Sequence, residues 1–551
     1  MEIFKIEKLT YFYPGMEQPA LRNVNLSVKE GEFLFIAGPS GCGKTTLAKV
    51  FAGLIPDFYG GKIEGVVLFR GESLFARNKK DSRREIGMVF QEPEKQLITR
   101  SVEAELAFGP ENLGLSVSEI KRRIAETVGF LGLEKLLERK VENLSSGEKQ
   151  KTVLGSILAM GVKVIILDEP VSALDPVAAE EVFHVLKRLK DDLGYTIILI
   201  EQRSERCLDL ADRVVFLEDG KIVKDSACHD FIRWAYKEKE EYLPFYTRVF
   251  KEENLDNMPL TISDARKLLV KKAALGKEAG KESENARDYF CAENKKLIEV
   301  RNVSFAYDDA SSAVLENINF SVSENDFVCV LGENGAGKST LLKLIMGFLK
   351  PFVGRVSVLG KNMFSLPGAE KARIAGYLSQ NPNSYFLNDT LEKELKFTLD
   401  NLGKEDNGVI DGLLEFLRIE RYRHKNPREL SVGEKTRAAL ALVMAGEPKI
   451  LLLDEPTRGL NHSLKEDLGK RLKSFVKENR GAVVVVTQDV DFAAEFAGKI
   501  VLLFRGEVIS CGNKYEVLKE NLYYSSSLNK LFRGVDSDVI TMGDALEWIK
   551  A

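Results

Sequence analysis

The chain carries one glycine-rich motif twice, and the two copies lie 294 residues apart. The spacing G-x-x-x-x-G-K-[ST] predicts a phosphate-binding loop, in which backbone N–H groups surround phosphate oxygens, the lysine adds charge, and the hydroxyl is offered to Mg²⁺. An apolar run before each copy and helical spacing after it predict a strand, a loop and a helix, whose N-terminal dipole also favours phosphate. The first copy is Gly38, Pro39, Ser40, Gly41, Cys42, Gly43, Lys44, Thr45 and Thr46, and the second is Gly332, Glu333, Asn334, Gly335, Ala336, Gly337, Lys338, Ser339 and Thr340.

The similarity extends well beyond these loops, and its offset falls in steps along the chain. Gln91-Glu92-Pro93 matches Gln380-Asn381-Pro382 at an offset of 289, and Asp168-Glu169-Pro170 matches Asp454-Glu455-Pro456 at 286. Small deletions between the motifs of a tandem duplication explain the steps. Continuous apolar runs before the Asp-Glu pairs predict central strands of a covered parallel sheet.

We therefore predict an α/β protein with two nucleotide-binding domains and small tails. Residues 1–232 and 296–515 form the two domains. Residues 233–295 form a helical tail and a solvated connector that is rich in Lys, Glu, Ala and Gly, and residues 516–551 form a C-terminal helical tail. Thr261-Ile262-Ser263-Asp264-Ala265 resembles Thr541-Met542-Gly543-Asp544-Ala545. This echo indicates one tail on each half, although two helix entries can also share such a pattern by chance.

Composition narrows the possible partners. The net charge of −4 arises from 79 basic and 83 acidic residues, so no global electrostatic term favours nucleic acid. The six cysteines have no zinc or iron–sulfur spacing, no apolar run reaches the roughly 18 residues of a membrane helix, and no secretory signal is visible at the start. We expect a cytoplasmic protein with reduced cysteines and no covalent cofactor.

The motif order resembles one family closely, the ATP-binding cassette (ABC) ATPases. A phosphate loop, a glutamine loop, an L-S-x-G-E segment and a strand ending in Asp-Glu-Pro occur in this order in both halves. The resemblance implies tandem P-loop NTPase domains of ABC type, each with a helical subdomain, and two ATP molecules with Mg²⁺ between them. The L-S-x-G-E segment of each half would complete the site of the other half. The signature residues are Ser145 and Gly147, which would serve the site of Lys338, and Ser431 and Gly433, which would serve the site of Lys44.

The resemblance also assigns roles within each site. Tyr13 and Tyr307 would stack on adenine, and Glu169 and Glu455 would polarise the attacking water. The ligands of Mg²⁺ and its water would be Thr45, Gln91 and Asp168 in the first site and Ser339, Gln380 and Asp454 in the second.

Three positions depart from the family pattern. Gln202 and Gln488 stand where the family has a switch histidine, so we expect turnover without the pH dependence of an imidazole. These glutamines could instead only fill the loop. Ser146 and Val432 replace a usual glycine, and Asn461 replaces the acidic residue that the first half keeps as Asp175.

The glutamine loop and the following segment of the first half resemble the ATPases of energy-coupling factor (ECF) transporters. In that family the region receives a transmembrane coupling subunit, which works with a small substrate-binding membrane protein. The resemblance implies a peripheral protein on the cytoplasmic side of the cell membrane that drives uptake of a vitamin or a transition-metal ion. The alternatives are a soluble tandem ABC ATPase acting on ribosomes or nucleic acid, and a degenerate nucleotide-binding regulator.

Overall fold

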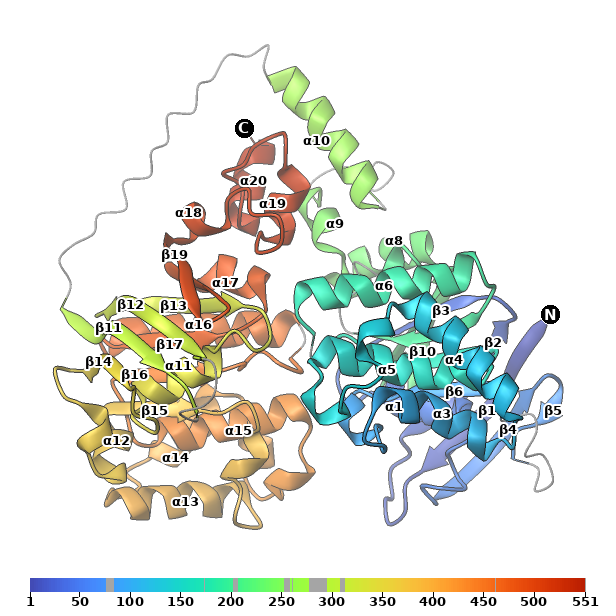
Figure 1. Cartoon of the computed structure of the whole chain (residues 1–551), viewed down its shortest axis with the longest axis horizontal. Helices are drawn as coiled ribbons and strands as arrows, with labels where there is room; N and C mark the ends of the chain where they lie inside the picture. The colour runs from blue at the N-terminus through green and yellow to red at the C-terminus, as the bar shows by residue number, and fades with distance from the viewer. Residues whose placement is uncertain are drawn as a thin grey trace. The chain divides into compact units, whose positions relative to one another are not determined.

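The structure is a computed structural model that describes residues 1–75, 84–172, 174–201, 207–251, 258–259, 261–276, 295–307, 313–460 and 462–550. It forms two compact units, Met1–Pro244 and Phe245–Ala551, each of which contains one copy of the repeat (Figure 1). We call the first unit the first cassette and residues 295–518 of the second unit the second cassette. Gln202 and Asn461 lie outside the described residues.

The first cassette is built around a mixed sheet with the strand order β10-β9-β3-β8-β7-β6, in which only β10 runs antiparallel to its neighbour. Every residue of β3, β7 and β8 is buried, as the continuous apolar runs predict. The strands are β3 (Phe33–Ala37), β6 (Ile86–Val89), β7 (Val164–Asp168), β8 (Thr196–Ile200), β9 (Arg213–Glu218) and β10 (Lys221–Ala227).

A second, antiparallel sheet packs against helix α1 (Lys44–Phe51), which begins at the lysine of the phosphate loop. Apolar residues of α1, of this sheet and of one face of the mixed sheet share one core. Helices α3 (Val102–Asn112), α4 (Val117–Leu131) and α5 (Ser146–Ala159) pack on one another and form the predicted helical subdomain. Helix α6 (Pro176–Asp191) and α8 (Cys228–Glu238) complete the unit. The antiparallel sheet has the order β2-β1-β4-β5, with β1 (Glu2–Phe12), β2 (Leu21–Lys29), β4 (Lys62–Phe69) and β5 (Glu72–Ser73).

The second cassette repeats this architecture, with an antiparallel sheet of the order β12-β11-β14. Its mixed sheet has the order β15-β16-β17-β13-β18-β19, which is the order of the first cassette read from the other edge. Figure 1 shows its helical subdomain, α13 to α15, below the strands. The strands are β11 (Lys296–Phe305), β12 (Leu315–Ser323), β13 (Phe327–Gly332), β14 (Val353–Val358), β15 (Ala375–Leu378), β16 (Ile450–Asp454), β17 (Ala482–Val486), β18 (Lys499–Phe504) and β19 (Glu507–Asn513). The helices are α11 (Lys338–Ile345), α12 (Gly368–Ile374), α13 (Leu391–Leu402), α14 (Val409–Phe416), α15 (Val432–Met444), α16 (His462–Glu478), α17 (Val490–Phe496) and α18 (Lys514–Leu518).

Four helices of the second unit form a separate core, which we call the tail module: α9 (Phe245–Val249), α10 (Ile262–Gly276), α19 (Ser527–Phe532) and α20 (Met542–Lys550). Its two halves use the same helix entry, because the Oγ1 of Thr261 and of Thr541 accept from the backbone N–H of Asp264 and Asp544 at 3.1 and 3.2 Å. The sequence echo therefore marks two equivalent helix entries that share one core, and the assignment of one tail to each half stays a prediction. The domain boundaries at 232 and 515 stay predictions.

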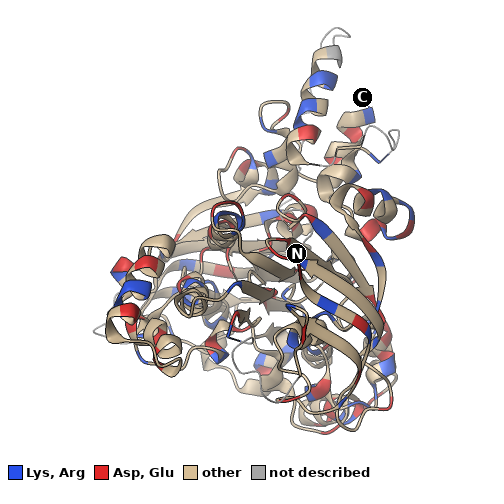
Figure 2. Cartoon of the chain, turned by 90° about the vertical axis from the view of Figure 1, so that its right-hand side faces the viewer, with Lys and Arg blue, Asp and Glu red and all other residues tan. Residues whose placement is uncertain are grey.

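The cartoon in Figure 2 shows Lys and Arg interspersed with Asp and Glu along the helices. Among the described residues, no helix is both long and apolar enough to span a bilayer. The cysteines of the described part, Cys42, Cys207, Cys228, Cys329 and Cys511, are free thiols.

Candidate active site

The two phosphate loops have the same internal contacts. Lys44 Nζ donates to the carbonyl oxygens of Gly38 and Pro39, at 2.8 Å each. Lys338 Nζ donates to the carbonyl oxygens of Gly332 and Glu333 at 2.9 and 2.7 Å. Each ammonium group is thus held over its own loop at the start of a helix, where an anion is also stabilised by the helix dipole.

Glycine is required at two places in each loop. A Cβ at Gly38 would lie 2.1 Å from the carbonyl oxygen of Leu217, and one at Gly332 would lie 2.2 Å from that of Leu503. Gly43 and Gly337 have φ values of 105° and 96°, which place them in the left-handed region immediately before the helix. The loops therefore follow a path that residues with a Cβ cannot follow without strain.

The two predicted adenine-stacking tyrosines lie beside these loops. The hydroxyl of Tyr13 is 3.1 Å from Thr46 Oγ1, and that of Tyr307 is 3.0 Å from Thr340 Oγ1. A cavity of about 450 Å³ lies against Tyr13 and is lined by residues of the following turn and by Gly61 and Lys62. A ring held in this way next to a phosphate loop offers an apolar face for a base.

Two of the three predicted Mg²⁺ ligands meet at the end of a central strand in each cassette. The hydroxyl of Thr45 hydrogen-bonds to Asp168, and that of Ser339 hydrogen-bonds to Asp454. Burial raises the pKa of Asp168 to about 6 and also raises the pKa of Asp454. A hydroxyl and a buried carboxylate are hard oxygen ligands that suit Mg²⁺, which takes its remaining ligands from phosphates and water. The residues therefore fit this ion.

The predicted water-polarising glutamates share an unusual backbone conformation. Glu169 and Glu455 have φ values of 49° and 52°, in the left-handed region that residues other than glycine rarely adopt. Such conformations occur where the surrounding structure enforces them, often at functional sites. Sequence reasoning missed this feature, because nothing in Asp-Glu-Pro signals a positive φ.

The surroundings of the two glutamates differ. Glu169 Oε2 accepts from Gln91 Nε2 at 3.0 Å, so the glutamine loop reaches the first glutamate. Gln380 of the second cassette is exposed. Glu455 is partly buried, and the desolvation of its carboxyl group raises its pKa to about 7.

The structure places one of the two predicted switch glutamines. The side chain of Gln488 donates a hydrogen bond to Asn334 Oδ1, a residue of the second phosphate loop. The side chain of Gln488 thus reaches the second phosphate loop, and its hydrogen bond to the γ-phosphate stays a prediction. The role of Gln202 stays a prediction.

The signature residues begin helices. Ser145 is the N-cap of α5 and Ser431 that of α15, and each forms a reciprocal capping box with the glutamate three residues later. Gly147 and Gly433 lie in the first turns of these helices, where an added Cβ would approach Ala178 and Leu460 at 2.8 and 2.7 Å. These helix starts can bind an anion. Pairing of each with the loop of the other cassette stays a prediction.

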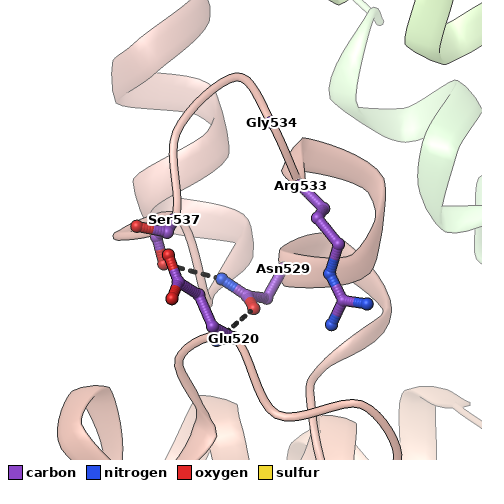
Figure 3. Close-up of a pocket in the computed structure, with 5 residues that line it drawn as sticks. All are labelled: Glu520, Asn529, Arg533, Gly534 and Ser537. Atoms are coloured by element: carbon purple, nitrogen blue, oxygen red, sulfur yellow. Dashed lines mark hydrogen bonds between the residues drawn. The ribbon is translucent and has the colours of Figure 1, made fainter.

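A second cavity of about 290 Å³ lies in the tail module and was not predicted. Figure 3 shows Asn529 between Glu520 and Ser537, and its amide donates to the carbonyl oxygen of Ser537 at 2.7 Å and accepts from Glu520 N at 3.3 Å. Asn529 thus holds the walls of the cavity together.

Comparison with known proteins shows the family of the chain. The family model described as "ABC transporter" matches residues 21–172 and 315–458. A protein of Bacillus thuringiensis subsp. konkukian named "Putative ABC transporter ATP-binding protein" is 34% identical over 98% of both chains. A protein of the same name from Clostridium tetani is 35% identical over 82% of this chain and 100% of its own length.

One solved structure extends over most of the chain. It is the complex of archaeal ribosomal stalk protein aP1 and archaeal ribosome recycling factor aABCE1, with 22% identity, 92% of this chain and 90% of that chain covered, and a TM-score of 0.58. This similarity supports the fold of two tandem cassettes. The chain belongs to the ABC transporter family, as an ATP-hydrolysing protein with two cassettes in tandem that uses ATP with Mg²⁺.

Proposed function

We propose that this protein is the ATPase subunit of an ECF-type importer, with both ATPase domains fused in one chain. It lies on the cytoplasmic side of the cell membrane, bound to a transmembrane coupling subunit that works with a small substrate-binding membrane protein. ATP hydrolysis drives uptake of a vitamin or a transition-metal ion, and the partner proteins select the substrate.

The observation that carries this proposal is a pair of exposed apolar side chains repeated in both cassettes. Ile98 and Phe108 of the first cassette are 70% and 40% exposed, and their equivalents, Leu387 and Phe397, are 68% and 45% exposed. We call these the paired apolar surfaces. Single exposed apolar side chains are common on protein surfaces. Apolar side chains that are exposed at equivalent positions in both cassettes instead favour a binding partner.

Each apolar surface is held in place by a buried carboxylate. Glu105, 4% exposed, accepts from the backbone N–H of Ile98 and Thr99 at 3.0 and 2.8 Å. Glu394, 1% exposed, accepts in the same way from Leu387 and Asn388. The segment that leads from the glutamine loop is thereby fixed to α3 or α13, and force on the exposed side chains would reach the glutamine loop.

Within each site, the proposed roles follow the contacts described above. Mg²⁺ would offset the charge that develops in phosphoryl transfer. Thr45 with Asp168, and Ser339 with Asp454, hold the ion. Glu169 and Glu455 accept the proton of the attacking water.

The remaining contacts to ATP complete the proposed sites. Tyr13 and Tyr307 stack on adenine, and Gln202 and Gln488 donate to the γ-phosphate. The signature residues of each cassette complete the ATP site of the other cassette, so that hydrolysis requires both. These residues are Ser145 and Gly147 at the site of Lys338, and Ser431 and Gly433 at the site of Lys44.

Action on ribosomes or nucleic acid is the alternative. The likeness to the ribosome recycling factor concerns the fold alone at 22% identity. The balanced charge gives no electrostatic preference for nucleic acid. Co-sedimentation with ribosomes in the following experiment would support this alternative.

Co-purification with membrane proteins tests the proposal. The chain is expressed with the membrane proteins encoded beside it and recovered in detergent. We expect a stoichiometric complex that is lost in the double variant Phe108→Asp Phe397→Asp, whereas the ATPase rate of the chain alone stays within about twofold. Leu193→Asp is the matched control, because Leu193 is 55% exposed and lies after α6, away from the paired apolar surfaces. Co-sedimentation with ribosomes, or a complex that survives the double substitution, would contradict the proposal.

A further inference from the structure

The switch glutamine of the second cassette is followed at once by a short helix. Gln488 donates a hydrogen bond to Asn334 Oδ1 in the second phosphate loop. The next residue, Asp489, is the N-cap of α17 and accepts from the backbone N–H of Phe492 at 3.2 Å. Because Gln488 directly precedes this cap, a displacement of α17 would move its side chain relative to the phosphate loop. The support of α17 therefore bears on the second ATP site.

The tail module is bonded directly to α17. Asp491 lies in the first turn of this helix, and Ser527 is the first residue of α19. The backbone N–H of Ser527 donates to Asp491 Oδ1 at 2.7 Å, and its hydroxyl donates to Oδ2 at 2.8 Å. A carboxylate that accepts through both of its oxygens is held in one orientation. The start of α19 thus fixes the helix that follows Gln488.

A second helix of the tail module reaches the same segment through α16. Arg248 of α9 lies with Nη1 2.6 Å from Nε2 of His462, the first residue of α16. Because a guanidinium group can only donate, the imidazole accepts this hydrogen bond. Further along α16, Lys465 donates to Asp489 Oδ2 at 2.6 Å. The cap of α17 is therefore connected to α9 as well as to α19.

Apolar packing continues this contact into the interior of the second unit. Ile540 lies between α19 and α20, is 1% exposed, and belongs to the same core as Val490 and Phe492 of α17. Its carbonyl oxygen accepts from the hydroxyl of Ser526, the N-cap of α19, at 2.7 Å. The hydrogen bonds of Ser527 to α17 are thus placed beside a buried apolar contact between the tail module and the same helix.

We propose that the tail module positions Gln488 at the second ATP site, and that Asp491 is the positioning residue through which it acts. While Ser527 and Ile540 hold α17, the amide of Gln488 stays within reach of the second phosphate loop. Release of these contacts lets α17 shift and slows hydrolysis in the second cassette. The inference rests on the proposed role of Gln488 in donating to the γ-phosphate, and it links the tail module to one ATP site.

The variant Ser527→Pro tests this link in the full chain. It removes both donors to Asp491 and is compatible with α19, because proline is favoured at the first position of a helix. The preceding residue, Ser526, has the extended backbone that a following proline requires, with φ of −61° and ψ of 156°. Ser527→Ala removes the hydroxyl alone. Arg266→Gln is the matched control, because Arg266 Nη2 donates to the carbonyl oxygen of Lys530 inside the tail module at 2.9 Å.

Hydrogen exchange without nucleotide measures the support of α17 and does not depend on catalysis. We expect the amides of residues 489–493 to exchange about tenfold faster in Ser527→Pro and about threefold faster in Ser527→Ala, since lost hydrogen bonds ease local opening. The amides of α11 and the Arg266→Gln variant should stay within about twofold of the unchanged protein. Thermal unfolding confirms that each variant is folded, and Ser527→Ala decides if Ser527→Pro is not. Unchanged exchange in residues 489–493 would overturn the inference.

ATP hydrolysis then shows whether the effect passes through Gln488. In the Glu169→Gln background, which leaves the second site to be read, we expect Ser527→Pro to lower kcat about fivefold with KM within about twofold. Gln488→Ala should lower kcat at least as much, and adding Ser527→Pro to it should cause no further loss. Losses that multiply in the combined variant would contradict a shared route and overturn the inference.

The same variants separate failure of the inference from failure of the site assignment. If Gln488→Ala keeps the kcat of its background, Gln488 has no role in hydrolysis, and the inference falls with that assignment. If Gln488→Ala is slow while Ser527→Pro keeps both its exchange rates and its kcat, only the inference falls. The assays need no membrane partner, so neither result bears on the transport proposal.

Discussion

The two cassettes are nearly identical where they would hold the phosphates and different where they would act on water. The lysine contacts and the tyrosine–threonine contacts agree between them to within about 0.1 Å. The glutamates, in contrast, have different partners: Gln91 in the first and Thr487 in the second. The two halves of the duplication therefore differ less in the contacts of the phosphate loops and tyrosines than in the contacts of the candidate catalytic glutamates. The substitutions described next test this difference.

The largest effect is expected when both glutamates lose their charge. Glu169→Gln Glu455→Gln should lower the ATPase rate by roughly 100- to 10,000-fold, because a general base contributes about that much. Phosphate release at saturating ATP measures it. The two single variants then divide the total rate between the cassettes. Equal ATPase rates and the same pH profile in the two single variants would contradict a difference between the two sites.

A smaller loss is expected from a methyl group in either loop. Gly38→Ala and Gly332→Ala should each destabilise their cassette by about 3 kcal/mol, since the added carbon would lie on a carbonyl oxygen. Thermal unfolding and ATP binding report the loss. Gly41→Ala is the control, because its Cβ would meet nothing within 4 Å and only its φ of +78° is unfavourable. Here the cassettes should respond alike, and a tolerated alanine in one of them would show that their loops differ.

The next effect concerns the tyrosines. Tyr13→Ala and Tyr307→Ala should weaken ATP binding about tenfold, the loss expected for one aromatic stacking contact. Equilibrium binding of a fluorescent ATP analogue measures it, with the other cassette blocked by the Lys→Ala change in its loop. The phenylalanine variants keep the ring and should bind within about threefold of the parent. Equally weak binding by Phe and Ala would assign the role to the hydroxyl contact with Thr46 or Thr340.

The smallest effect is expected at Cys42, whose equivalent in the second loop is Ala336. Cys42→Ala should change the free energy of unfolding by less than about 1 kcal/mol, because the replacement is small and the second loop already uses it. Burial raises the pKa of the Cys42 thiol, so in the folded protein the peptide that contains Cys42 should be labelled slowly by maleimide at pH 8 and faster as the pH rises. Rapid labelling of that peptide in the folded protein at pH 8, read by mass spectrometry, would contradict this account. Exposed Cys511 and the unfolded chain provide the reference rates.

Much of the fold follows from the sequence because the duplication can be read directly. The apolar runs at Val164–Leu167 and Ile450–Leu453 form buried central strands, and the loops precede helices that begin at Lys44 and Lys338. These predictions depend on local patterns of burial and on glycine spacing, which the sequence shows. The comparison with known proteins confirms the family and the tandem arrangement.

The local support of the glutamates does not follow from the sequence. The pairing of Glu169 with Gln91 and of Glu455 with Thr487 depends on strand register and on a positive φ, and neither leaves a recognisable pattern. The sequence does show that the residues after β8 and β17 differ, Glu201 in the first cassette and Thr487 in the second.

The tail module has a consequence for synthesis of the chain. Its core joins Tyr246 and Phe250, which precede the second cassette, to Phe532 and Ala545, which follow it. A ribosome must therefore make the whole second cassette before this core can close. A product that stops before α19 would lack the residues of α19 and α20 that complete the core.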